Sequence, residues 1–356
     1  MVHVHDQVKR WLGKRGPAVH KLNLFIHTGD LRQTWPQDAT GLLSLVPNLQ
    51  SLEMYDRGEF FAAAEDMKFI GQLTGLQHLQ LSLGLHELSF SQPATSEPLR
   101  HLASLESLSL HLGTYERGTA IRLSQHLADL SRLTHLAVSG CGPHNLRELI
   151  PQLTSLRSLS IGSRLEMLPS SFGSLCLLQS LSLGSFDRYG PAFSIPEALS
   201  SCQALARISL VELSRATVWE WSSLCKSFLC LPALRVLHII EADLSCVRDD
   251  AWVLHPQLQD LSLAYCCLQF CPAALCSLSS LTSLELQSNG LEHLPAGPYL
   301  EHLQELDISG NEDLADLSCL AAATSLQTLI LGKLTQVDSS EVAAVLPSTC
   351  YIDLLE

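Results

Sequence analysis

Twelve cysteines occur in the chain, and eight of them lie between residues 202 and 276. The densest group, with the spacing C-C-x3-C-x4-C, consists of Cys266, Cys267, Cys271 and Cys276. Thiolates at such short spacings bind zinc or form redox-active pairs. The alternative is a set of free thiols buried in a core, where cysteine behaves as a small hydrophobe. The repeat pattern described below favours buried thiols, and we expect no metal site.

Histidines form the second group with possible chemistry, because His78, His111 and His135 fall on neighbouring strands of the sheet predicted below. His78 and His135 occupy the same position two strands apart, which separates them by about 10 Å. A zinc ion needs each ligating nitrogen at about 2 Å, so the pair predicts polar contact or solvation. The glycine-rich phosphate loop, H-E-x-x-H and G-x-S-x-G motifs are all missing from the sequence. We therefore expect no enzyme and no cofactor.

The cysteines and histidines are positioned by a repeated sequence motif, L-x-x-L-x-L-x-x-(N/C/S)-x-L. The motif is clearest at 258–268, 281–291 and 303–314. Each copy predicts a short strand and a turn whose Asn or Cys side chain satisfies backbone groups. We call the second leucine of L-x-x-L-x-L the anchor. The anchors are Leu22, Leu52, Leu79, Leu108, Leu136, Leu159, Leu181, Ile208, Leu237, Leu261, Leu284, Leu306, Leu329 and Ile352.

Successive anchors are separated by 22 to 30 residues, which predicts a solenoid of about fourteen repeats. Cys266 lies five residues after its anchor, the position that Asn289 and Asn311 occupy in later repeats. Cys141 holds the same position after Leu136. The sequence therefore predicts that Cys266 is structural.

The segments between strands are expected on the convex side of the solenoid. Residues 60–73 and 121–130 predict helices, and the L-P-x-x-F phrase at 168–172 predicts an extended or 3-10 turn. A further helix near residue 220 carries Trp219 and Trp221. One of these rings is either an exposed contact or, as we favour, buried against the helix of the previous repeat.

A short capping segment followed by a single domain is expected. Residues 1–18 predict a capping helix with Val8, Trp11 and Leu12 on one face, and residues 19–356 predict a single solenoid domain.

Alternate side chains of a strand point the same way, so residues one before, one after and three after each anchor face the concave side. Candidate contact residues at the N-terminal end are Phe25, Tyr55, His78, His111 and His135; those at the C-terminal end are Asp260, Tyr265, Glu285, Glu305 and Asp307. The serine-rich middle lacks aromatic and arginine anchors. The acidic residues fit either a basic partner or a merely solvated surface, and both interpretations stay open.

From about residue 19 the chain resembles the leucine-rich-repeat family, with intracellular plant-type and ribonuclease-inhibitor-like repeats. The resemblance implies an α/β horseshoe with a concave parallel sheet and convex helices, 3-10 turns and loops, which binds a partner protein on the concave face. Residues 10–26 also resemble the segment that follows the F-box in F-box/leucine-rich-repeat receptors. The alternatives are thus a substrate-recognition arm of a ubiquitin ligase, or the sensor arm of a plant-type immune receptor.

The composition of the chain limits the kinds of partner that it can bind. The net charge of −14 over 356 residues disfavours nucleic acid and anionic membrane surfaces. The sequence has no apolar run long enough to span a membrane, and its first residues lack a secretory signal. We therefore expect an intracellular, cytoplasmic, monomeric protein-interaction scaffold whose partner is another, possibly basic, protein.

Overall fold

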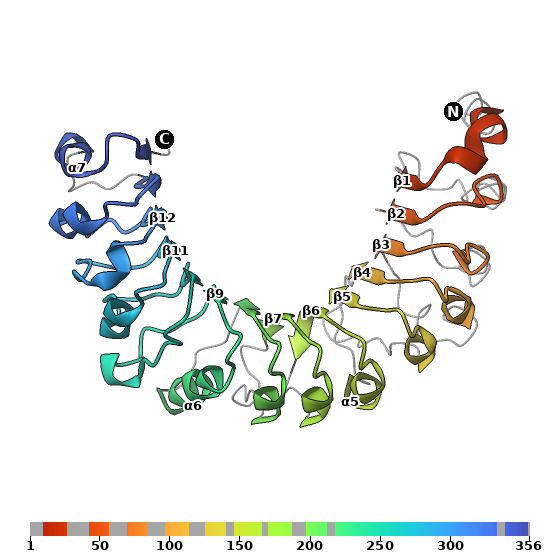
Figure 1. Cartoon of the computed structure of the whole chain (residues 1–356), viewed down its shortest axis with the longest axis horizontal. Helices are drawn as coiled ribbons and strands as arrows, with labels where there is room; N and C mark the ends of the chain where they lie inside the picture. The colour runs from red at the N-terminus through yellow and green to blue at the C-terminus, as the bar shows by residue number, and fades with distance from the viewer. Residues whose placement is uncertain are drawn as a thin grey trace. The chain divides into compact units, whose positions relative to one another are not determined.

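The structure, a computed structural model, describes residues 10–26, 43–56, 70–84, 97–113, 125–139, 146–165, 170–186, 197–211, 218–332 and 339–354. The chain forms two compact units, which we call the first unit (Met1–Ser163) and the second unit (Arg164–Glu356). In each of them, strands lie on one side and short helices on the other (Figure 1). We call these sides the sheet face and the helix face.

The strands run parallel and follow the order of the chain, β1 to β6 in the first unit and β7 to β14 in the second. Those of the first unit are β1 (Lys21–Ile26), β2 (Ser51–Asp56), β3 (His78–Gly84), β4 (Ser107–Gly113), β5 (His135–Ser139) and β6 (Ser158–Leu165). Those of the second are β7 (Ser180–Phe186), β8 (Arg207–Val211), β9 (Val236–Ile240), β10 (Asp260–Ser262), β11 (Ser283–Glu285), β12 (Glu305–Asp307), β13 (Thr328–Ile330) and β14 (Tyr351–Asp353).

Every predicted anchor lies in a strand, and within each unit anchors stand in register. Leu52, for example, is paired with Leu22 on one side and Leu79 on the other. The register is fixed by backbone groups just before each strand. The carbonyl of Glu106 accepts hydrogen bonds from the N–H groups of Thr134 at 2.9 Å and His135 at 3.0 Å, and the same pairing recurs in other repeats. The repeating α/β solenoid predicted from the sequence is therefore confirmed.

The helix face is built mainly from 3-10 helices, and the leucine spacing explains why. In a 3-10 helix, side chains three residues apart eclipse one another. Leu99, Leu102, Leu105 and the anchor Leu108 have this spacing, and all four are buried. Hydrogen bonds from Leu102 N to Leu99 O and from Leu105 N to Leu102 O close the corresponding turns. A three-residue leucine period therefore directs one row of side chains into the core.

The 3-10 helices are η1 (Gly16–Ala18), η2 (Glu97–His101), η3 (Gln125–Asp129), η4 (Ile150–Gln152), η5 (Ser170–Ser174), η6 (Glu197–Ser201), η7 (Asp249–Ala251), η8 (Ala273–Ser277), η9 (Pro298–Leu300) and η10 (Ser318–Ala322). The α-helices are α5 (Leu146–Leu149), α6 (Val218–Leu229) and α7 (Ser339–Val345). The predicted turn after Leu168 and the helix around Trp221 are thus confirmed. The predicted helix at 121–130 is a 3-10 helix in its described part, and most of 60–73 lies outside the described residues.

The N-terminal segment is helical over residues 10–15 and continues into η1. Leu12 is buried but Trp11 is 52% exposed, so the expectation that both share one packed face is wrong. Gly16 is the point of close approach, because a Cβ atom there would lie 1.7 Å from the carbonyl oxygen of Leu45. Asn48 Nδ2 also donates to the Pro17 carbonyl at 2.8 Å. The capping role of residues 1–18 stays a prediction, as does the single-domain boundary at residue 19.

Candidate functional site

The sheet face carries the side chains that the alternation of the strands predicts. In β5, Leu136 and Val138 are buried, whereas His135, Ala137 and Ser139 are exposed or half-buried. Of the ten candidate contact residues, His78, His111, His135, Tyr265 and Glu305 are exposed, and Tyr55, Asp260, Glu285 and Asp307 are half-buried. Phe25 lies in β1 in register with Tyr55. The candidates therefore form two sets, one on each unit.

In the first unit, polar side chains of the sheet face are bonded to one another. Glu53 accepts a hydrogen bond from Asn23 Nδ2 at 2.9 Å and forms an ion pair with Lys21 Nζ at 2.8 Å. Gln80 Nε2 donates to the hydroxyl of Tyr55 at 2.9 Å. These contacts join neighbouring strands, so the hydrogen-bonding capacity of this surface is largely used within the unit.

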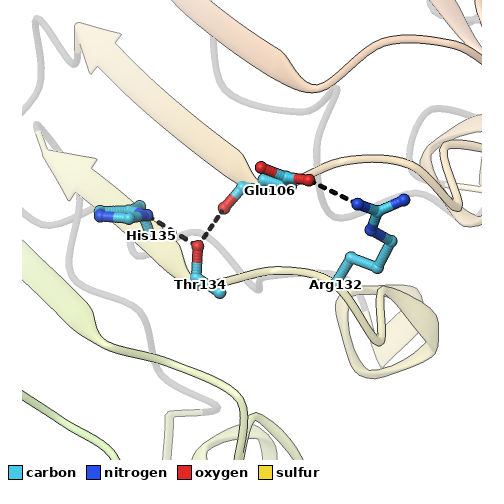
Figure 2. Close-up of polar contacts among 4 residues, drawn as sticks. All are labelled: Glu106, Arg132, Thr134 and His135. Carbon is cyan, nitrogen blue, oxygen red and sulfur yellow. Dashed lines mark hydrogen bonds and ion pairs between the residues drawn. The ribbon is translucent and has the colours of Figure 1, made fainter.

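Two of the candidate histidines of the first unit, His111 and His135, each lie against a hydroxyl group. Ser139 Oγ lies 2.6 Å from His111 Nδ1, and Thr134 Oγ1 lies 2.8 Å from His135 Nδ1. Figure 2 shows that the Thr134 hydroxyl also donates to the Glu106 carbonyl, while Arg132 pairs with the Glu106 carboxylate at 2.7 Å. Within the described residues, no group of three His, Cys, Asp or Glu side chains has the arrangement of a metal site. His111 and His135 thus make local polar contacts within the first unit.

The acidic residues of the second unit lie close together on adjacent strands. Asp260 and Glu305 are both in register with Ser283, and Glu285 is in register with Asp307. Adjacent strands are about 4.8 Å apart, so these four carboxylates lie within a patch three strands wide. We call Asp260, Glu285, Glu305 and Asp307 the acidic strip.

The four carboxylates differ in their contacts. His238 Nε2 lies 3.0 Å from Asp260 Oδ1. Asp307 Oδ1 accepts hydrogen bonds from the backbone N–H and the hydroxyl of Ser309, at 2.9 and 2.6 Å. Among the residues that the structure describes, none gives the carboxylate of Glu285 or of Glu305 a hydrogen bond or an ion pair. Their charges are therefore available to a partner, unlike that of Glu53 in the first unit.

Tyr265 lies in the turn after β10, with a left-handed backbone, φ +57°, and is 49% exposed. The equivalent positions in neighbouring repeats are Glu241, Ser288 and Gly310, which also have positive φ. A non-glycine residue in this region costs roughly 1–2 kcal/mol, so a large aromatic there disfavours the fold. Sequence reasoning named Tyr265 but missed this strain, since only Gly310 gives a local signal for positive φ.

The asparagine position after the strand is confirmed as structural. Asn289 Nδ2 donates to the carbonyls of Leu263 and Leu286, both at 2.8 Å. Its Oδ1 accepts from the backbone N–H groups of Cys266 and Leu268, both at 3.0 Å. One side chain thus joins the turns of two repeats and satisfies four backbone groups.

Cys266 occupies the same position in the preceding repeat. Its thiol donates to the carbonyls of Ile239 at 3.1 Å and Ala264 at 3.3 Å, and the side chain is buried. The predicted structural role is therefore confirmed, while Cys141 lies outside the described residues. Cys267 is exposed, and Cys271 and Cys276 are half-buried. Burial raises the pKa of the Cys271 thiol, as do the neighbouring Cys276 and Cys319.

Buried thiols give the protein a specific sensitivity to high pH. Burial raises the pKa of Cys266 to about 12, well above the value of 9.0 for a free thiol. Between these values the unfolded chain loses the proton that the folded chain keeps, so the free energy of unfolding falls as pH rises. The loss from this thiol is about 2 kcal/mol between pH 8 and pH 10.5, at about 1.4 kcal/mol per pH unit.

The check is urea unfolding of wild type, Cys266→Ala and Cys267→Ala at both pH values. Cys266→Ala is less stable at pH 8 but loses about 2 kcal/mol less than wild type on going to pH 10.5. The matched control Cys267→Ala, at an exposed neighbouring position, keeps the wild-type pH dependence. Equal losses in all three proteins would contradict a protonated, buried Cys266.

Trp221, one of the two tryptophans of α6, is buried, and its described ring contact was not predicted. Trp221 packs edge-on against Trp252, with ring centroids 4.6 Å apart and an interplanar angle of 62°. Trp252 follows η7, so this contact is with the next repeat and was not predicted, while burial of one ring against the previous helix stays a prediction. The two residues are 31 positions apart, and no local pattern connects them. The alternative of an exposed Trp219 lies outside the described side chains.

Ser262 was not predicted as a site residue. It lies one residue after the anchor Leu261, in register with His238 and Glu285, yet it is fully buried and its hydroxyl has no hydrogen-bond partner among the described residues. Ser262, His238 and Asp260 are the residue types of a hydrolase triad. The serine–histidine hydrogen bond that activates such a nucleophile is missing from the described contacts. The arrangement therefore provides a buried polar group rather than an activated nucleophile.

The class of protein follows from this repeat geometry and from the sequence. The profile of the leucine-rich repeat region matches residues 83–312. The chain therefore belongs to the leucine-rich repeat family. No curated protein sequence matches the chain.

Three solved structures show what the fold is similar to. An internalin of Listeria monocytogenes has a TM-score of 0.52 and 17% identity, with 92% of this chain and 94% of that chain covered. The Toll–Spatzle complex of Drosophila has a TM-score of 0.57 and 18% identity, with 92% and 48% covered. The TLR13–ssRNA13 complex has a TM-score of 0.51 and 18% identity, with 97% and 62% covered. At these identities the likeness establishes the fold alone, and the repeat subtype and the F-box resemblance stay predictions.

Among the helices of the described segments, none combines the length and the apolar character that crossing a bilayer requires.

Proposed function

We propose that the protein is a non-enzymatic scaffold that binds a basic partner protein on the sheet face of its second unit. The contact residues are those of the acidic strip, together with the neighbouring Tyr265. The observation that carries the proposal is the state of Glu285 and Glu305, whose carboxylates have no bonded partner among the described residues.

The contrast between the two units supports this choice of surface. Glu53 in the first unit is held by Lys21 and Asn23, so a partner there would have to displace existing contacts. Glu285 and Glu305 need only lose water when a cation arrives. Complementary charge also speeds association and discriminates among partners. Tyr265 adds an exposed aromatic ring beside the strip, the residue type that most often contributes binding energy.

A nucleic acid fits this surface poorly. The TLR13–ssRNA13 complex shows that a protein of similar fold binds RNA. Here the proposed surface carries carboxylates, which repel phosphates, and the whole chain has a net charge of −14. We therefore propose a protein partner with clustered Lys or Arg.

We further propose an intracellular location, on the evidence of the thiols. The eleven cysteines of the described segments are all free, and Cys176, Cys230, Cys246 and Cys267 among them are exposed. Free exposed thiols are compatible with a reducing compartment, whereas oxidising compartments favour disulfides. The location and the monomeric state are open to direct measurement by fractionation and light scattering.

The test is capture of partners from native lysate by wild type and by a charge-reversed variant, at low and at high salt. The variant carries Asp260→Lys, Glu285→Lys, Glu305→Lys and Asp307→Lys. We expect wild type to retain a basic protein at low salt and release it at high salt, and the variant to retain none of it. Retention of the same protein by both would refute the acidic strip as its binding site.

A further inference from the structure

Ser262 stands out among the serines of the sheet face. Serines hold the position one residue after the anchor in several strands, including Ser109, Ser160, Ser182 and Ser209, and all of these are half-buried. Ser262 has no exposed surface, and its Oγ finds no hydrogen-bond partner among the described residues. A buried hydroxyl without a partner costs roughly 1–3 kcal/mol, so it marks a polar group that the folded unit alone does not use.

The alternation of β10 places this hydroxyl on the sheet face. Leu261 and Leu263, on either side of Ser262, are core leucines. Ala264, two residues further on and just after β10, is also buried, so the chain carries short side chains at both of these positions. The strands on either side carry longer ones, His238 on β9 and Glu285 on β11, each in register with Ser262. The Ser262 hydroxyl thus lies low between two long polar side chains.

Carboxylates flank this hydroxyl on two sides. The carboxylate of Glu285, in the adjacent strand, has no bonded partner among the described residues, and Asp260 precedes Ser262 by two residues on the same strand. Asp260 is held at 3.0 Å by His238 Nε2, which leaves further acceptor capacity on its two oxygens. Three hydrogen-bond acceptors of the sheet face therefore lie close together: the Ser262 hydroxyl and the carboxylates of Asp260 and Glu285. The two carboxylates are charged.

We propose that Asp260, Ser262 and Glu285 form a binding site for one arginine side chain of the basic partner. This inference rests on the proposed function and names the group that the surface recognises. A guanidinium group has five N–H donors in a rigid plane and no acceptor, which matches one hydroxyl and two carboxylates. An ammonium group is a compact point charge with three donors and is more strongly hydrated, so it satisfies the same acceptors less well.

The site predicts opposite effects of one substitution on stability and on binding. Ser262→Ala removes a buried hydroxyl that has no partner, so the melting temperature stays equal or rises. The same change removes an acceptor for the guanidinium group, so binding of an arginine-rich probe weakens. A substitution that merely damaged the fold would lower both quantities.

The experiment measures binding of fluorescein-labelled octa-arginine and octa-lysine by anisotropy to the full chain. We expect Ser262→Ala to weaken octa-arginine binding by about tenfold and octa-lysine binding by about twofold or less. The matched control Ser209→Ala, at the same position of β8, is expected to leave both unchanged. The charge-reversed variant is expected to bind neither probe.

The possible outcomes distinguish failure of the arginine site from failure of the acidic strip as a binding surface. If wild type binds both probes and the charge-reversed variant binds neither, but Ser262→Ala binds like wild type, the arginine site is refuted and the acidic surface stands. If octa-lysine loses as much affinity as octa-arginine in Ser262→Ala, the preference for guanidinium is refuted. If the charge-reversed variant binds both probes as wild type does, or wild type binds neither, the proposed function fails as well.

Discussion

Asn311→Ala is expected to lower the free energy of unfolding by about 3–5 kcal/mol, the largest effect of any single polar substitution that we predict here. Asn311 is fully buried. Its Nδ2 donates to the carbonyls of Leu286 at 3.0 Å and Ile308 at 2.9 Å, and its Oδ1 accepts from Leu291 N at 3.2 Å. Alanine leaves the Ile308 carbonyl and the Leu291 N–H buried without partners, and each such group costs roughly 1–3 kcal/mol. The Leu286 carbonyl keeps its second donor, Asn289 Nδ2.

Urea unfolding followed by circular dichroism measures this effect, and Asn23→Ala is the matched control. Asn23 is exposed and makes one hydrogen bond, to Glu53, so its loss is expected to cost less than about 1 kcal/mol. Hydrogen exchange adds a local test, because the amide of Leu291 loses its acceptor in Asn311→Ala. Equal stability of the two variants would contradict a structural role for the asparagine position.

The second large effect concerns binding. For the captured partner, reversal of all four charges of the acidic strip is expected to weaken binding at least about 100-fold at low salt, because each attraction becomes a repulsion of similar size. Wild-type affinity is expected to fall steeply as ionic strength rises toward 0.5 M, where the screening length drops below about 5 Å. The residual binding of the variant is expected to depend little on salt or to increase with it.

A second variant controls for net charge. It carries Lys at four exposed acidic positions outside the strands: Asp250, Glu292, Glu301 and Asp313. Both variants change the net charge by +8, since each Asp or Glu to Lys change contributes +2, so nonspecific attraction changes equally. We expect the control to bind within about threefold of wild type, since its charges lie outside the strands that carry the acidic strip. Comparable losses in both variants would mean that net charge alone governs the interaction.

The fold was predictable because its determinants are local and repeated. A leucine every three residues before each strand, and every two residues within it, directs side chains to one core whatever the loop length. The anchor Leu136 could therefore be paired with Leu108 and Leu159 from the sequence alone, and the structure confirms both pairs. The role of Cys266 followed from the same count, because its offset from Leu261 equals that of Asn289 from Leu284.

The features that the sequence did not reveal depend on neighbours one repeat away. Trp221 meets Trp252 and His238 meets Asp260 only after the intervening segment has set the spacing of the repeats. Burial of Ser262 is a still finer effect, since half-buried Ser209 has the same offset from its own anchor. The exposure of Ser262 depends on its surroundings, which include the long side chains of His238 and Glu285. Trp11 was misplaced because residues 10–15, the described part of this helix, are too few to show a reliable periodicity.

The most direct test of a binding surface on the second unit is site-specific photocrosslinking from three serine positions. In the test variant, benzoyl-phenylalanine replaces Ser283, which is in register with Asp260 and Glu305. In the first control it replaces Ser107, which holds the same position in the first unit. In the second control it replaces Ser279, an exposed residue of the turn before β11. We predict a crosslinked protein partner from position 283 that disappears at high salt, and none from 107 or 279. A partner crosslinked from 107 or 279 but not from 283 would contradict the account.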